Sequence, residues 1–217
     1  MKKQLITLVI TALIAGGCGG RAVRENRPQI QANLSFQSDT LLVNGLQLVK
    51  TTDENSRIYC LTTINGDTII PFADYYHQIE FLDINEDGFT DIRVFIFSDT
   101  PNECYNYLFD SQNKTFREIY NYLPIQKVSG TDFYYSYEAE GCADMNWISL
   151  LSKIKDDRLV HYGIIRGYGC EGQKFIIIKK IVDTKEIEIK SLPYTENLDK
   201  WDFIKNYWKA NHKIFEK

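Results

Sequence analysis

Short apolar and aromatic runs alternate with polar turn sequences between residues 41 and 192, a pattern typical of β-strands. The runs include TLLVNGLQLVK, RIYCLTTINGDTIIPF, HQIEFLD, DIRVFIFSD, YNYLFD, DFYYSYEAE, NWISLLSKI, RLVHYGIIRG, KFIIIKKIV and EIEIKSL. They hold most of the 14 tyrosines and 12 phenylalanines, residues that pleated, half-buried surfaces favour. Roughly ten strands, about a dozen residues apart, predict an all-β fold: a sandwich, a barrel or an irregular propeller-like arrangement.

The pattern changes to a helical period near the C-terminus. Leu198, Trp201, Ile204 and Trp208 recur at helical spacing, and Asn197 is a suitable N-cap. We therefore expect one C-terminal amphipathic helix packed on the sheet. The alternative interpretation of this tryptophan-rich stripe is a partner-binding face.

The N-terminus has the three parts of an export signal. Met1-Lys2-Lys3 is positive, Leu5 to Ile14 is apolar, and small residues precede Cys18. A cysteine in this place resembles the lipobox of bacterial lipoproteins, although Ala15 stands where leucine is usual. The resemblance implies a signal peptide over 1–17, lipidation of Cys18, and a tether over 18–35 that anchors the chain at the cell envelope, periplasmic or surface-exposed. An ordinary signal peptide cut elsewhere is the alternative.

Residues 36–217 then predict a single β-rich domain with an acidic surface. Loss of Lys2 and Lys3 takes the formal charge from −4 to −6. This charge, together with the lack of a basic cluster in the sequence, argues against a nucleic-acid partner and favours cationic partners.

The stretch FLDINEDGFTD places oxygen-bearing side chains at alternate positions before a glycine. Calcium takes about six to eight oxygen ligands, and alternate positions of a tight loop can converge on one ion. We therefore predict a calcium (Ca2+) site and not a bare acidic turn, with Gly88 allowing the sharp bend. The expected ligands are the side chains of Asp83, Asn85, Asp87 and Asp91 and the backbone carbonyl of Phe89.

The loop is not an EF-hand, because the position of the closing glutamate is taken by Val94. D-x-N-x-D-G-x-x-D instead resembles the calcium loops of integrin-type FG-GAP and VCBS repeats, which join two β-strands. The longer stretch from Gln78 to Tyr122, with its turn from Asp110 to Phe116, is similar to periplasmic lysozyme inhibitors. That resemblance implies calcium binding and lysozyme inhibition, but it maps no inhibitory residue onto this chain.

Four cysteines remain after Cys18, and in an exported domain they predict two disulfides. NWISLLSKI and RLVHYGIIRG should form a hairpin around Lys155-Asp156-Asp157. A turn centred on Asp156 would set Ile148 opposite Ile164 and Cys142 opposite Cys170. We therefore predict a Cys142–Cys170 bridge and, by elimination, a Cys60–Cys104 bridge.

The sequence offers little for catalysis. It has no H-E-x-x-H, G-x-S-x-G or P-loop motif, and His77, His161 and His212 are scattered. Glu138 and Glu140 could pair as glycosidase carboxylates, although adjacent exposed acids are common. We expect a non-enzymatic binding module for a protein, such as a cationic lysozyme. Cell-surface glycan binding is the main alternative, and a purely structural lipoprotein is the third.

Overall fold

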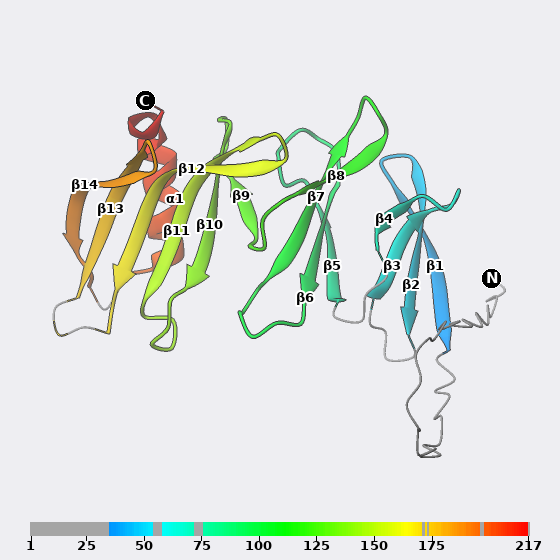
Figure 1. Cartoon of the computed structure of the whole chain (residues 1–217), viewed down its shortest axis with the longest axis horizontal. Coiled ribbons are helices and arrows are strands. Elements are labelled where there is room, and N and C mark those ends of the chain that lie inside the picture. The colour runs from blue at the N-terminus through cyan, green and yellow to red at the C-terminus, as the bar shows by residue number, and fades with distance from the viewer. Residues whose placement is uncertain are drawn as a thin grey trace, which may run out of the picture. The chain divides into compact units, whose positions relative to one another are not determined.

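The structure, a computed structural model, describes residues 35–53, 58–71, 76–170, 172, 174–195 and 198–216. These residues form fourteen strands in three antiparallel sheets, followed by one α-helix and a short 3-10 helix (Figure 1). The predicted all-β fold with one C-terminal helix is confirmed.

Each sheet is built from strands that follow one another in the sequence, as short turns between antiparallel neighbours dictate. The N-terminal sheet contains β1 (Phe36–Val43), β2 (Leu46–Asp53), β3 (Ile58–Thr63) and β4 (Thr68–Ile70). The middle sheet contains β5 (Tyr76–Leu82), β6 (Asp91–Ile96), β7 (Cys104–Asp110) and β8 (Thr115–Ile119). The C-terminal sheet contains β9 (Ile125–Lys127), β10 (Phe133–Ala139), β11 (Trp147–Lys155), β12 (Arg158–Tyr168), β13 (Phe175–Val182) and β14 (Lys185–Pro193).

The chain divides into two compact units, whereas the sequence predicted one domain over 36–217. Of the described residues, the smaller unit holds 35–42, 47–53 and 58–71, and the larger holds 43–46 and those from 76 onward. Turn signals look the same within a unit and between units, so the sequence pattern did not mark this division. The middle and C-terminal sheets and the helix all belong to the larger unit, which also holds the candidate site.

The hairpin between β11 and β12 forms as predicted, but in a different register. Leu150 faces Ile164, and Ile148 faces Arg166, not Ile164. The turn consists of Asp156 and Asp157, which have φ angles of 49° and 59°, so it is a two-residue turn and not one centred on Asp156. A bulge between Leu151 and Ser152 shifts the register by one further residue.

The helix α1 (Lys200–Asn211) begins at Asp199, whose side chain accepts hydrogen bonds from the backbone N–H groups of Trp201 and Asp202. The expected cap, Asn197, lies outside the described residues. A short 3-10 helix, η1 (His212–Phe215), follows. Of the predicted apolar stripe, Ile204 and Trp208 are buried, while Trp201 is 50% exposed.

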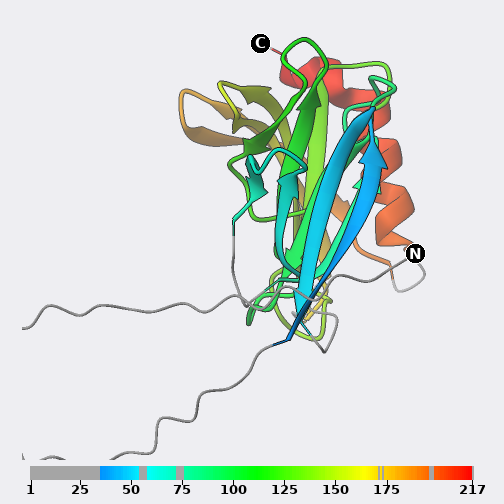
Figure 2. The same ribbon diagram turned by 90° about the vertical axis from the view of Figure 1, so that its right-hand side faces the viewer.

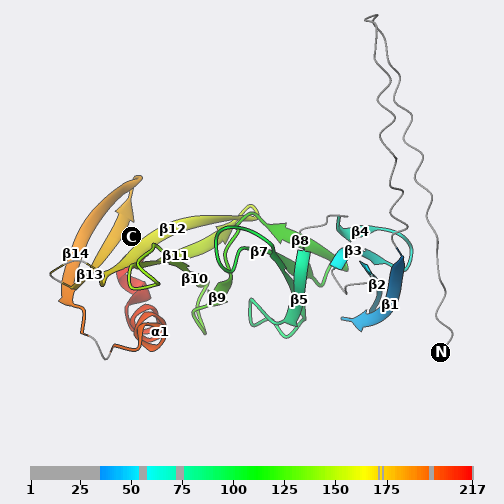
Figure 3. The ribbon, with the colours of Figure 1, turned by 90° about the horizontal axis from the view of Figure 1, so that it is seen from below.

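The main core lies between α1 and the C-terminal sheet, along whose strands the helix runs (Figures 2 and 3). The indole N–H of Trp208 donates to the Ser149 hydroxyl at 2.9 Å. Glycine is needed where rings meet the sheet: a Cβ on Gly163 would lie 2.6 Å from Phe215, and one on Gly167 would lie 2.3 Å from Trp147. The helix is thus an integral part of the core.

Candidate metal centre

The candidate loop, residues 83–90, connects β5 to β6 in the middle sheet. The backbone of Gly88 has a φ of 87°, in the left-handed region that the predicted sharp bend requires. Glu86 also has a positive φ, 55°. Two left-handed residues so close together curl the chain back on itself between the two strands.

Three of the predicted ligand side chains turn inward onto this curled backbone. The Asp87 N–H donates to oxygens of both Asp83 and Asn85 at 3.1 Å, so these two oxygens converge on one group. The second oxygen of Asp83 accepts from the Gly88 N–H at 2.9 Å. Asp87 in turn accepts from the Phe89 N–H at 2.9 Å and from the Asn85 amide at 2.9 Å. The loop therefore gathers carboxylate and amide oxygens on one side.

Asp91 has a different environment, because it is fully buried at the start of β6. Its two oxygens accept from the N–H groups of Ile84 and Phe109, each at 2.8 Å, which ties the loop to β7. Burial raises the pKa of Asp91 to about 6, while the hydrogen bonds from Phe109 and Ile84 act in the opposite direction. Asp91 thus positions the loop.

Asn44 also holds the loop, a contact that the sequence did not reveal. Its side chain accepts from the Thr90 N–H at 2.8 Å and donates to the Thr90 carbonyl at 2.7 Å. The sequence signal at Asn44-Gly45 predicted only a turn, and that turn is present with φ angles of 49° and 80°. The ring of Phe89 lies 5.6 Å from that of Phe109, which fixes the C-terminal end of the loop.

The donor set determines which ion the loop suits. Carboxylate and amide oxygens without sulfur or imidazole suit calcium better than zinc or copper. Histidine, cysteine, aspartate and glutamate alone form no cluster of three or more in metal-binding proximity within the described ranges. Any metal site here therefore depends on the amide of Asn85 and on backbone oxygens in addition to the carboxylates.

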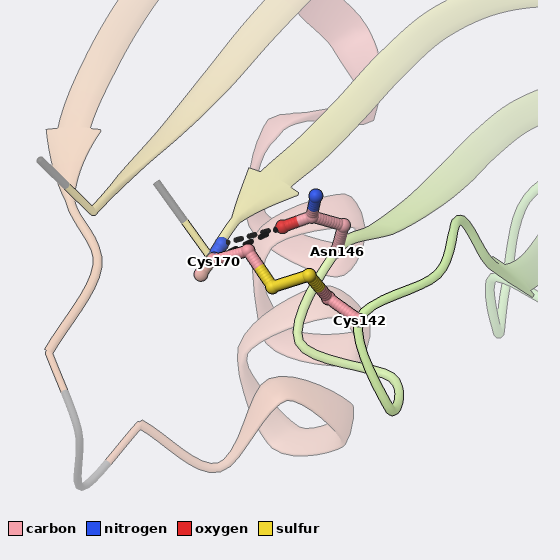
Figure 4. The surroundings of a disulfide bond; sticks show 4 residues. Cys142, Asn146 and Cys170 are labelled. Carbon is pink, nitrogen blue, oxygen red and sulfur yellow. Dashed lines mark hydrogen bonds between the residues drawn. A yellow bond between two sulfur atoms is a disulfide. The ribbon is translucent and has the colours of Figure 1, made fainter. Parts of the chain in front are cut away.

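The predicted Cys142–Cys170 disulfide is present, with a Cα–Cα distance of 6.2 Å (Figure 4). The pairing of β11 with β12 ends at Trp147 and Gly167, and both cysteines lie beyond this end. They are therefore not a facing pair within the two strands, as the sequence predicted. Asn146 closes this end of the hairpin: its side-chain oxygen accepts from the N–H groups of Gly169 at 2.9 Å and Cys170 at 3.2 Å.

The second predicted bridge is not formed, since Cys60 and Cys104 are both free thiols. That pairing was inferred by elimination and had no support from strand register. Cys104 is fully buried beside Asn106 in β7. Burial raises the pKa of the Cys104 thiol to about 12, which makes it an unreactive core residue.

The residues considered for catalysis lie in separate places. His161 hydrogen-bonds Ser152 at 2.8 Å, and His212 lies at the end of α1 against the Lys209 carbonyl. His77 lies against Phe97, with 4.7 Å between ring centroids. Glu140 forms an ion pair with Arg166 at 2.8 Å. Each of these side chains thus contacts a different partner.

The predicted lipidation site, Cys18, and the whole leader lie outside the described residues. Within the described part of the chain, no helix has the length and apolar character needed to cross a bilayer.

Comparisons with known proteins give one distant structural match. No protein family and no curated protein matches the sequence. A solved structure described as a Xanthomonas type IV secretion system related protein is similar at a TM-score of 0.43 and 16% identity. The match covers 73% of this chain and 90% of that one.

Proposed function

We propose that this chain is a calcium-binding, non-enzymatic binding module that recognises a protein partner. We further propose that a lipid on Cys18 holds it at the bacterial cell envelope, periplasmic or surface-exposed. The observation that carries the proposal is the inward convergence of Asp83, Asn85 and Asp87 on the curled backbone around Gly88.

Electrostatics favours a cation in this loop. Three aspartates lie within nine residues, and the charge of Asp87 contributes to the raised pKa of Asp91, after the larger effect of burial. A divalent cation would offset this repulsion and use the lone pairs that backbone N–H groups leave free. Magnesium fits less well, because it resists the dehydration that an all-protein site demands.

A protein partner follows from the charge of the chain and from the resemblance to periplasmic lysozyme inhibitors. The formal charge of −4 complements a cationic protein such as a lysozyme. Glycan binding is the second candidate, because several large aromatic side chains are exposed. These are Phe97, Tyr120, Tyr122 and Trp201.

The test combines capture and inhibition. The purified chain, immobilised at fixed free calcium, is offered a basic lysozyme or polysaccharides including peptidoglycan, with and without chelator. We expect retention of the lysozyme, a loss of its activity, and weaker retention after chelation. Retention of polysaccharide alone would favour the glycan candidate, and turnover of peptidoglycan by the chain would overturn the non-enzymatic assignment.

A further inference from the structure

A cavity of about 550 Å³ lies between the candidate loop, β9 and α1, all within the larger unit. Four basic side chains and two acidic ones contribute to its lining: Arg93, Lys127, Lys205, Lys209, Asp83 and Glu86. This excess of positive charge runs against the net charge of −4 of the whole chain. A cavity of this size falls in the range of small-ligand sites, about 300–1,000 Å³.

The acidic groups in the lining already have partners. Glu86 accepts from the Ser129 hydroxyl at 2.9 Å, and Asp83 accepts from the backbone of the loop. Neither carboxylate forms an ion pair with a lysine of the cavity within the described ranges. Both carboxylates keep their negative charge, and four basic side chains against two acidic ones leave the lining with two positive charges in excess.

Lys205 and Lys209 lie one turn apart on the same face of α1, and both are exposed. No ion pair or side-chain hydrogen bond is formed by either lysine with another described residue. Like charges at this spacing destabilise a helix unless an anion lies between them. Lys127, from β9, hydrogen-bonds the neutral Tyr134 hydroxyl at 3.2 Å, and its charge also acts on Asp132, which is ion-paired with Lys153.

Arg93, from β6, supplies a cation that the surrounding residues hold in place. It is 6% exposed, and its guanidinium donates to the Asn106 side chain at 2.9 Å and the Ile125 carbonyl at 2.6 Å. Glu80 lies 3.9 Å from the guanidinium, and Asp91 is a second acidic neighbour whose charge acts on it. An anion would meet this rigid group without having to order it first.

We propose that this cavity binds a small anion with two or more negative charges, carried by carboxylate or phosphate groups. Lys205 and Lys209 would contact it from the helix, Lys127 from β9, and the Arg93 guanidinium would act through its field from the wall. The site goes beyond the proposed function, and the anion can bind there without calcium or a protein partner.

The test uses glutarate as the carboxylate probe and glycerol 2-phosphate as the phosphate probe, because both chelate calcium weakly. Each is titrated calorimetrically into the whole chain at low, matched ionic strength and fixed free calcium. The Lys205→Gln/Lys209→Gln variant keeps good helix formers on α1. Lys185→Gln/Lys213→Gln removes the same charge at exposed positions outside the cavity lining.

We expect at least one probe to bind, and the first variant to weaken that binding about tenfold. The control variant should bind as the unmodified chain does. Binding of glutarate alone or of glycerol 2-phosphate alone would identify the anionic group. Binding of neither probe would overturn the proposal. So would an equal loss of affinity in both variants with unchanged melting temperatures, because that result would reflect general surface charge only.

Discussion

Asp87 lies in the acidic loop and Asp91 directly after it at the start of β6, and their different surroundings give them different roles. Asp87 is exposed and shares its oxygens with Asn85 and the Phe89 N–H. Asp91 is buried and joins the loop to β7 through Phe109. Removing the Asp91 carboxylate would leave buried N–H groups without a partner, so such a variant confuses metal loss with unfolding. Asp87 is the better position at which to test calcium.

We expect Asp87→Ala to abolish calcium binding while the calcium-free protein keeps its melting temperature. If calcium binds only the native state, a free concentration of one hundred times the dissociation constant raises the free energy of unfolding by about 2.7 kcal/mol. The variant should lose this increment, measured by calorimetric titration and by melting with and without chelator. Asp67→Ala, in the exposed turn before β4, is the matched control. A chelator-sensitive melting temperature that survives in Asp87→Ala would contradict the prediction.

The hairpin of β11 and β12 is held at its open end by a disulfide and at its closed end by a two-residue turn. The Cys142–Cys170 bridge spans a sequence separation of 28, and it should stabilise the larger unit by about 3–4 kcal/mol on the chain-entropy model. Cys142→Ser/Cys170→Ser should lose that amount in denaturant unfolding. The signal is tryptophan fluorescence, because Trp147, Trp201 and Trp208 all lie in this unit.

Cys60→Ser provides the control, since Cys60 is a free thiol in the smaller unit. It should leave the tryptophan transition unchanged. Equal midpoints for the double variant and the unmodified chain under oxidising conditions would show that Asn146 and the strand ladder hold the hairpin without the bridge.

The same elements show what local sequence patterns can predict and where they stop. Strand positions, the Asn44-Gly45 turn and burial of Ile204 and Trp208 in α1 follow from short-range periodicity, and all of them are present. The register of β11 on β12 does not, because neither the two-residue turn nor the bulge between Leu151 and Ser152 could be read from the pattern. The bridge was predicted correctly from a register that was wrong, since loops at the end of the hairpin brought the cysteines together.

The candidate site likewise has parts that local spacing predicts and parts that it does not. Asp83, Asn85 and Asp87 are close in sequence, so their convergence on one loop could be predicted from spacing. The two hydrogen bonds between Asn44 and Thr90 join residues 46 positions apart, so they cannot be predicted from local spacing. The cavity is still less local, because Lys127 and Lys205 come from a strand and a helix that tertiary packing brings to one cavity.

At the scale of the whole molecule, the proposed calcium loop and the proposed anion cavity share side chains. Asp83 is an expected calcium ligand and also lines the cavity, as does Glu86 of the same loop. Bound calcium would neutralise the negative charge that the loop presents to an anion. Because coupling between two binding sites is reciprocal, the anion should strengthen calcium binding by the same factor.

We therefore expect calcium to tighten binding of the favoured probe, glutarate or glycerol 2-phosphate, by about fivefold, a modest coupling of the kind common between linked sites. The effect should shrink as salt rises from about 0.01 to 0.15 M, because screening shortens the range of the loop's charge. Calorimetric titrations of each ligand in the presence and absence of the other measure both sides of the linkage. Asp87→Ala should bind the anion without responding to calcium, and magnesium should not replace calcium. An anion affinity that is the same at zero and saturating calcium would show that the two sites are independent, even if each of them binds its ligand.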